Sequence, residues 1–101
     1  MNPSASGMLG ILNRAGLLAF GYDALTKMRK ASLLLLGGDA STSSLSKFTS
    51  LASKLGVEIL TVPTKAELGA PLGYDELTAV AILSKKGAAS LKEKLRKGDN
   101  P

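Results

Sequence analysis

The sequence contains no cysteine and no histidine. Without cysteine the chain forms no disulfide and has no thiolate chemistry, which favours a reducing compartment. Without histidine it lacks the commonest general base and the commonest metal ligand. The serines therefore have no histidine to activate them, and the adjacent acids Asp75 and Glu76 do not form a recognisable catalytic pair. We expect a protein that is not an enzyme and that has no metal site, no cofactor and no small-molecule substrate.

Long apolar runs are also missing. No run approaches the length of a membrane span, and the first residues, "MNPSASG", lack the basic start and apolar block of a signal peptide. We therefore expect no membrane association and a cytoplasmic location.

What is present is enough apolar sequence for one folded domain. The chain has 101 residues, of which 45% are hydrophobic, so a real core can form. We expect a single domain over residues 1–101, with residues 1–6 and 98–101 frayed.

The net charge of +5 is unevenly distributed. Residues 1–36 hold four cations and one acid, and residues 85–101 hold six cations and two acids, whereas the acids outnumber the cations between them. A basic surface attracts polyanions, and RNA is the abundant cytoplasmic polyanion. The same charge also serves solubility alone, so both interpretations stay open.

Apolar periodicity predicts helices that alternate with short strands. The expected helices cover residues 8–15 (with Ser4 or Ser6 as the N-cap), 22–30, 41–55, 64–69 and a last one capped by Ser84. The expected strands cover residues 17–20, 32–37, 57–62 and 77–83. This order predicts an α/β sandwich, in which a central sheet is covered on both faces.

The stretch "LLLLGGDAS" resembles a phosphate-binding turn, because a strand, glycines and a helix start follow one another. A dinucleotide site needs a third glycine, a P-loop needs a lysine, and neither is present. Asp39 would also repel a phosphate there. We expect the glycines to form a turn and Asp39, Ser41 or Thr42 to cap the next helix, with a nucleotide site at 37–41 as a minor alternative.

Two other segments are better candidates for binding a polyanion. In "AFGYDALTKMRK" (19–30), a helix start with free N–H groups is followed by cations. In "AELGAPLGYDELTAV" (66–80), Tyr74 follows Gly73 in a loop, where it can stack on a base. The simpler alternatives are an ordinary surface helix with an Asp23–Lys27 pair, and a tyrosine packed back on the domain.

Considered together, these segments resemble the ribosomal protein family of the L-seven-Ae and L-thirty-e type, especially its small stand-alone bacterial members. The matching pieces, in order, are "LGILNRAGLL", "FGYDALTK", "LLLLGGDAS", "GVEILTVPTKAELGAPLG" and "AVAILSKKGAASLKEKL". The resemblance implies a three-layer α/β/α sandwich with a four-stranded mixed sheet. It also implies binding of kink-turn RNA, either ribosomal or another structured RNA, in a ribonucleoprotein that serves translation.

The same resemblance implies where the RNA binds. Family members grip the RNA with the start of the second helix and with the loop before the last strand. Gly21 and Lys27 match the family motif at that helix, Asp23 takes its asparagine position, and Ala24 takes its glutamate position. The segment "KMRKASLLLL" is shorter than in typical members, so the helix would end early or meet its strand differently. The expected RNA-binding residues are Arg14, Gly21, Tyr22, Asp23, Lys27, Arg29, Lys30, Gly73, Tyr74 and Asp75.

We therefore expect a non-catalytic RNA-binding protein. The alternative is a protein-interaction or scaffold module that keeps the fold but has lost specific RNA recognition. The departures at Ala24, Asp75 and Glu76 favour that alternative.

Overall fold

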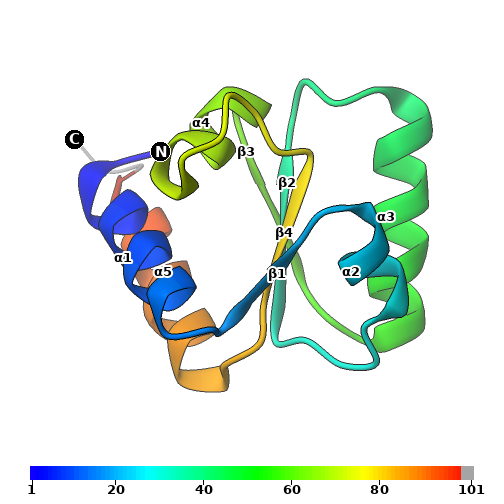
Figure 1. Ribbon diagram of the computed structural model, residues 1–101, viewed down its shortest axis with the longest axis horizontal. Coiled ribbons are helices and arrows are strands. Elements are labelled where there is room, and N and C mark those ends of the chain that lie inside the picture. The colour runs from blue at the N-terminus through cyan, green and yellow to red at the C-terminus, as the bar shows by residue number, and fades with distance from the viewer. Residues whose placement is uncertain (99–101) are drawn as a thin grey trace.

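The structure is a computed structural model that describes residues 1–98, apart from the side chains of Tyr22 and Lys97. Helices and strands alternate along this part of the chain (Figure 1). The elements are α1 (Pro3–Arg14), β1 (Leu18–Phe20), α2 (Tyr22–Lys27), β2 (Leu33–Gly37), α3 (Thr42–Leu55), β3 (Ile59–Val62), α4 (Lys65–Gly69), the 3-10 helix η1 (Ala70–Leu72), β4 (Ala79–Ile82) and α5 (Lys85–Gly98). The alternation expected from the sequence is confirmed.

The four strands form one mixed sheet in the order β1-β4-β2-β3. Strand β4 is antiparallel to both β1 and β2, and β2 is parallel to β3. Consequently β1, β2 and β3 all finish at the same end of the sheet, called here the carboxyl end, and start at the opposite, amino end. The mixed four-stranded sheet is as expected.

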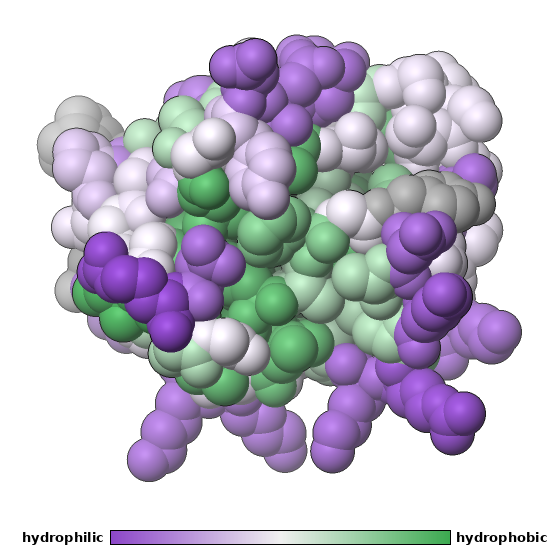
Figure 2. All heavy atoms as spheres, viewed as in Figure 1, coloured by the Kyte–Doolittle hydropathy of each residue, from purple (hydrophilic) through white to green (hydrophobic). Residues whose placement is uncertain are grey.

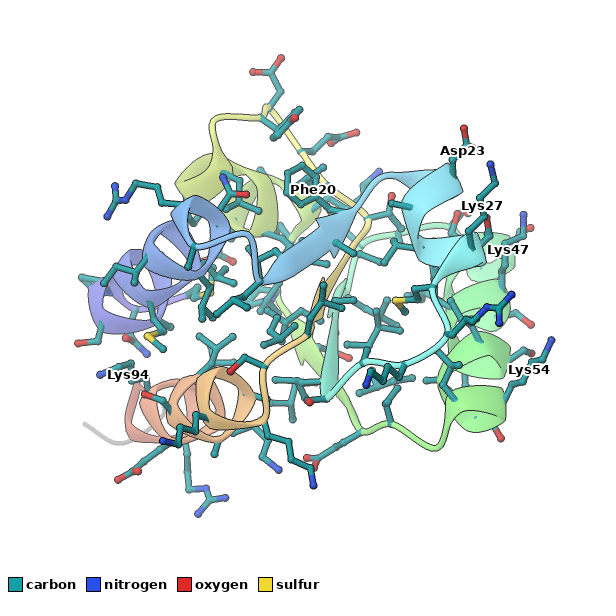
Figure 3. All side chains as sticks on the ribbon, turned by 60° about the horizontal axis from the view of Figure 1, so that its bottom comes forward. Phe20, Asp23, Lys27, Lys47, Lys54 and Lys94 are labelled. Atoms are coloured by element: carbon teal, nitrogen blue, oxygen red, sulfur yellow. The ribbon has the colours of Figure 1, made fainter. Side chains whose placement is uncertain are left out.

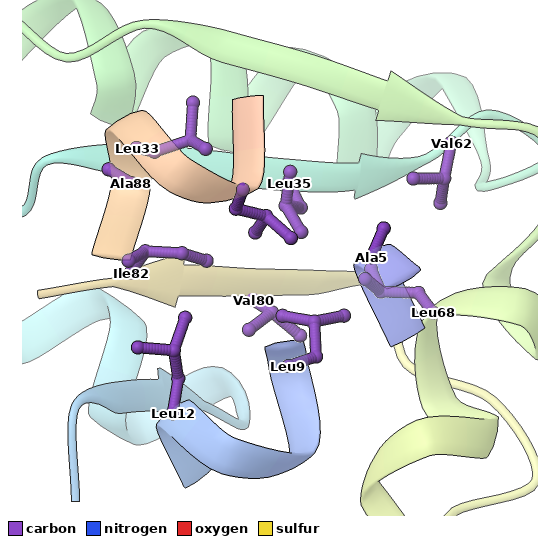
Figure 4. Close-up of a cluster of buried hydrophobic side chains, with 11 residues drawn as sticks. Ala5, Leu9, Leu12, Leu33, Leu35, Val62, Leu68, Val80, Ile82 and Ala88 are labelled. Atoms are coloured by element: carbon purple, nitrogen blue, oxygen red, sulfur yellow. The ribbon is translucent and has the colours of Figure 1, made fainter. Parts of the chain in front are cut away.

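Helices cover both faces of the sheet (Figure 1): α1 and α5 pack on one face, and α2 and α3 on the other. Strand β2 is buried on both faces, because its successive side chains alternate between them. Leu33 and Leu35 join the core under α1 and α5, which Figure 4 shows, whereas Leu34 and Leu36 join the core under α2 and α3. This is the three-layer α/β/α sandwich.

Three expected helix starts are confirmed in detail. The Ser41 hydroxyl accepts from Ser44 N at 3.1 Å to begin α3. The Thr64 hydroxyl accepts from Glu67 N at 3.1 Å to begin α4. The Ser84 hydroxyl accepts from Gly87 N at 3.0 Å before α5. Each cap satisfies an N–H that has no partner within its helix.

The expected fraying of residues 1–6 is wrong. Helix α1 begins at Pro3, and its N-cap is Asn2 rather than Ser4 or Ser6. The Asn2 side chain accepts from Ala5 N at 2.9 Å and donates to the carbonyl of Lys94 at 2.8 Å, which ties the chain start to α5. Ala5 is fully buried, so the first turn belongs to the core. Of the expected frayed end at 98–101, Gly98 ends α5, and residues 99–101 lie outside the described part.

The expected length of the second helix is also wrong. Helix α2 ends at Lys27, and Met28 is already extended, with φ −69° and ψ 146°. Met28 and Ala31 pack against the core under α2 and α3, which requires the chain to leave the helix and cross toward β2. Arg29 and Lys30 therefore lie in the connection to β2, not on the helix.

Within residues 1–98, no helix is both long enough and apolar enough to cross a membrane.

Candidate functional site

The two segments singled out in the sequence meet at the carboxyl end of the sheet. The rings of Tyr74 and Phe20 form an edge-to-face pair, with centroids 5.3 Å apart and an interplanar angle of 73°. Edge-to-face geometry is favourable for aromatic pairs. Tyr74 nevertheless remains 50% exposed, so part of its ring is available to a ligand. Tyr74 therefore packs on the domain with part of its ring, as the simpler alternative expected, and the rest of the ring stays exposed.

Gly21 makes the turn from β1 into α2. Its backbone has φ 94° and ψ 144°, which side chains rarely adopt, and it is the N-cap of the helix. Asp23 in the first turn and Lys27 in the last turn are both exposed. No ion pair forms between these two described residues, so the alternative of an ordinary Asp23–Lys27 pair is not seen. The backbone of Tyr22 belongs to α2, but its side chain lies outside the described part of the structure.

The loop that carries Tyr74 is held by backbone hydrogen bonds to α4 and η1. Gly73 N donates to the carbonyl of Ala70 at 3.1 Å, and Tyr74 N donates to the carbonyl of Gly69 at 3.1 Å. Leu77 N donates to the carbonyl of Lys65 at 3.0 Å. A Cβ atom on Gly69 would lie 2.8 Å from the backbone of Glu76, so only glycine allows this close approach. The position of Tyr74 is therefore set by α4.

A small hollow of about 270 Å³ lies beside this junction. It is lined by Gly21, Leu25, Ser44, Phe48, Glu76, Leu77, Thr78 and Ala79. Its volume is below the roughly 300–1,000 Å³ of typical small-molecule sites, and among the described residues that line it only Glu76 is charged. The hollow suits one inserted group rather than a whole cofactor.

The structure divides the expected RNA-binding residues between the two ends of the sheet. Gly21, Asp23, Gly73, Tyr74 and Asp75 belong to segments at the carboxyl end. Arg14 precedes β1, and Arg29 and Lys30 precede β2, which places all three cations at the amino end. Lys27 differs from these three cations, because it lies in the last turn of α2, a helix that begins at the carboxyl end. The expected residues therefore do not form one basic face.

Acids predominate where the two segments meet. Asp23, Asp75 and Glu76 are all exposed there. Lys65 offsets only part of this charge, because its ammonium group lies 3.5 Å from a Glu76 carboxylate oxygen. Phosphates are therefore disfavoured next to Tyr74, and a base or another uncharged planar group is favoured there.

Cations that sequence reasoning missed lie on the adjacent helix. Lys47 and Lys54 are seven residues apart on α3, which places them on the same helix face. In Figure 3 they lie on the same side of the molecule as Lys27, whereas Lys94 lies in the opposite helix layer. In the sequence, only the seven-residue spacing of Lys47 and Lys54 could have suggested that these two lysines share a helix face. Their position beside Lys27 depends on the tertiary contact of α2 with α3. We call Lys27, Lys47 and Lys54 the lysine row.

The glycines of "LLLLGGDAS" have a structural task. A Cβ atom on Gly37 would lie 2.7–2.9 Å from atoms of Lys65, and one on Gly38 would lie 3.1 Å from the carbonyl oxygen of Val62. The Asp39 carboxylate accepts from Lys65 N at 2.7 Å, so it binds the start of α4 rather than capping α3. The start of α4 thus occupies the space against Gly37 that a phosphate would need.

A second hollow, of about 380 Å³, lies at the β3 edge, away from the predicted residues. Its lining is Met1, Asn2, Glu58, Leu60, Thr61, Val62, Pro63, Lys92, Leu95 and Arg96. Lys92 pairs with Glu58 at 2.9 Å across it. Among the described residues, no cluster of three or more acids is arranged to hold a metal ion.

No protein-family model matches the sequence, and no curated protein matches it significantly. Among solved structures, the chain is similar to a protein of unknown function from Bacillus halodurans, with a TM-score of 0.73 and 20% sequence identity. The match covers 90% of this chain and 99% of that chain. This likeness supports the fold and carries no information about function.

Proposed function

We propose that the protein binds structured RNA and catalyses no reaction. The observation that carries the proposal is the contact of Tyr74 with Phe20, which joins the β1–α2 turn to the loop before β4 and leaves half of Tyr74 exposed. Proteins that bind single-stranded or looped RNA use such exposed aromatic rings to stack unpaired bases.

The acids around Tyr74 are compatible with contacts to bases. An ionised carboxylate only accepts hydrogen bonds, and the amino groups of guanine, adenine and cytosine are donors. Asp23 is exposed one turn before Lys27, so it can accept from a base that reaches the start of α2. Tyr74 would stack one base, and Asp23 would accept a hydrogen bond from a base at the start of α2.

The phosphates belong on the lysine row. Lys27, Lys47 and Lys54 lie along one side of α2 and α3, with Asp23 next to Lys27 (Figure 3). Contacts to phosphates supply most of the affinity and make it depend on salt, whereas contacts to bases supply specificity. The proposed site therefore separates the two tasks between neighbouring surfaces.

The family resemblance narrows the proposal to kink-turn or related RNA, in a cytoplasmic ribonucleoprotein with a role in translation. Gly21, Asp23, Lys27 and the 73–76 loop stand at the positions where L-seven-Ae-type proteins hold RNA. The contact of Phe20 with Tyr74 supports this narrower proposal, because it places those two segments side by side.

Binding of a kink-turn RNA, compared with a duplex of equal length, tests the proposal. Affinity is measured by fluorescence anisotropy over a range of salt concentrations. Lys27→Ala should lower the affinity for both RNAs and reduce the slope of log affinity against log salt by about 1. Lys94→Ala is the matched control, since it removes the same charge from α5 in the opposite layer and should leave the slope unchanged.

Tyr74 tests the base contact separately. Tyr74→Ala should weaken kink-turn binding by about 1–3 kcal/mol, and Tyr74→Phe should retain it, because stacking needs the ring and not the hydroxyl. Equal affinity for every RNA in a structured panel, with Tyr74→Ala as good as the native protein, would refute specific recognition.

A second candidate function is a protein-interaction module that has lost RNA recognition. The acids Asp75 and Glu76 favour it, because they follow Tyr74 directly in the exposed loop where RNA is expected. Partners captured by the tagged protein from its own cell distinguish the two. Capture that survives ribonuclease supports the interaction module, and capture abolished by ribonuclease supports RNA binding.

A further inference from the structure

Edge strand β1 has unpaired main-chain groups on its outer side. Leu83 N donates to the carbonyl of Leu17, and Ala19 is the partner of Ala81 in the ladder with β4. Because hydrogen-bonded pairs alternate in an antiparallel ladder, Leu17 and Ala19 direct their N–H and C=O groups toward β4. Leu18 and Phe20 direct theirs away from the sheet, where another strand can bind.

Exposed apolar side chains also occur on segments that contact β1 or lead into it. The large hydrophobic residues that are exposed in the described chain are Ile11 at 55%, Tyr74 at 50% and Leu83 at 41%. Tyr74 lies against Phe20, Leu83 bonds to Leu17, and Ile11 belongs to α1, the helix that leads into β1. Figure 2 shows hydrophobic surface across this side of the molecule, which Figure 1 shows as the β1 side.

The other edge strand, β3, is protected differently. Leu34 N donates to the carbonyl of Glu58, and Gly38 N donates to that of Val62. By alternation, Ile59 and Thr61 have outward-facing main-chain groups. That edge is flanked by the Lys92–Glu58 ion pair and ends at Pro63, and charges and proline discourage strand pairing. The two edges therefore differ, and β1 is the one open to a partner.

We propose that the partner is a second copy of this chain, joined through antiparallel pairing of β1 with β1 about a two-fold axis at Ala19. In that register Leu18 lies opposite Phe20 of the other copy. The outward N–H and C=O groups of these two residues then exchange two hydrogen bonds, as in any hydrogen-bonded pair of an antiparallel ladder. The two Ala19 side chains meet at the axis, where strands approach most closely and a methyl group fits. The result is a continuous eight-stranded sheet.

Charge complementarity selects this occupant. Arg14 lies at the start of β1 on the α1 side of the sheet. Asp75 follows Tyr74, which contacts Phe20 at the end of β1, and Phe20 packs against the core on that same side. A two-fold axis places the start of one β1 beside the end of the other, so Arg14 of each copy faces Asp75 of its mate.

Sedimentation of ribonuclease-treated protein from about 10 μM to about 1 mM covers the range of weak dimers. The protein should be a dimer at the upper end. Arg14→Glu and Asp75→Lys should each weaken dimerisation by about tenfold or more, and the double variant should recover most of the loss. Thr61→Lys, on the exposed β3 edge, should leave dimerisation unchanged.

Amide hydrogen exchange provides a readout that needs no substitution. The amides of Leu18 and Phe20 should become protected as concentration rises, whereas those of Ile59 and Thr61 should stay unchanged. A protein that is monomeric at the highest concentration overturns the proposal. So does a dimer that neither Arg14→Glu nor Asp75→Lys weakens, or one in which the β3 amides gain the protection. The proposal does not depend on RNA binding, and RNA-free protein tests it separately.

Discussion

Gly69 is the residue that most tightly couples the fold to the proposed site. It lies at the end of α4 in ordinary helical backbone, with φ −78° and ψ −36°, so alanine is not strained there by conformation. A Cβ atom would nevertheless lie 2.8–3.0 Å from backbone atoms of Glu76. Because those atoms are backbone, the loop as a whole must move, and Tyr74 moves with it.

The size of the effect follows from two opposing contributions. Replacing a helical glycine by alanine stabilises by about 1 kcal/mol. Forcing an extra methyl group into a packed position destabilises by about 1–3 kcal/mol. Gly69→Ala should therefore lower the free energy of unfolding by up to about 2 kcal/mol. Gly7 is a helical glycine of α1, and a Cβ atom added there would have no atom within 4 Å. Gly7→Ala should therefore show the stabilising contribution without the steric one.

Thermal unfolding of the two variants measures the difference. Gly7→Ala should raise the melting temperature and Gly69→Ala should lower it, at about 4–8 °C per kcal/mol for a domain of this size. In nuclear magnetic resonance spectra, the contact between the rings of Phe20 and Tyr74 should persist in Gly7→Ala and weaken in Gly69→Ala. If Gly69→Ala is as stable as Gly7→Ala and keeps the ring contact, the close approach of the loop to α4 is refuted.

Two further predictions concern stability. Leu34→Ala should lower the free energy of unfolding by about 2–5 kcal/mol, because Leu34 is fully buried beside Leu25 and Phe48, and urea denaturation measures the loss. Asn2→Ala should lower it by about 0.5–2 kcal/mol, because α1 loses its cap and the Lys94 carbonyl of α5 loses the hydrogen bond that it accepts from Asn2; an unchanged urea midpoint would contradict the capping role of Asn2.

Much of the fold was predictable from the sequence because the relevant signals are local. The apolar run at 33–37 predicts a strand buried on both faces, and Ser41 and Gly56 predict both ends of α3. Gly56 ends that helix with φ 69°, as expected of a glycine cap. In each case the residues that determine the structure lie within one turn or one strand of it.

The errors concern contacts between distant segments. Helix α2 continues in the sequence pattern to Lys30, but it ends at Lys27 because Met28 and Ala31 pack under the sheet. Asn2 begins α1 partly through its bond to Lys94, far away in the chain. The spacing of apolar residues along the chain gives no information about either of these two contacts.

In the candidate site too, local features were predictable from the sequence, and contacts between distant segments were not. The sequence indicated the β1–α2 turn and the Tyr74 loop, and the structure places them together. It did not indicate that the cations Arg14, Arg29 and Lys30 lie at the opposite end of the sheet, because this follows from the strand order. Nor did it indicate that Asp39 binds the start of α4, which depends on the close packing of Gly37 against Lys65.

Comparison of the native protein with Tyr74→Ala and Tyr74→Phe on a kink-turn RNA tests the central claim most directly. Titrations at one fixed salt concentration, with an equal-length duplex as competitor, measure specific affinity. RNA recognition at the Phe20–Tyr74 junction predicts tighter binding to the kink-turn than to the duplex, lost in Tyr74→Ala and kept in Tyr74→Phe. Equal binding of both RNAs by all three proteins would contradict it.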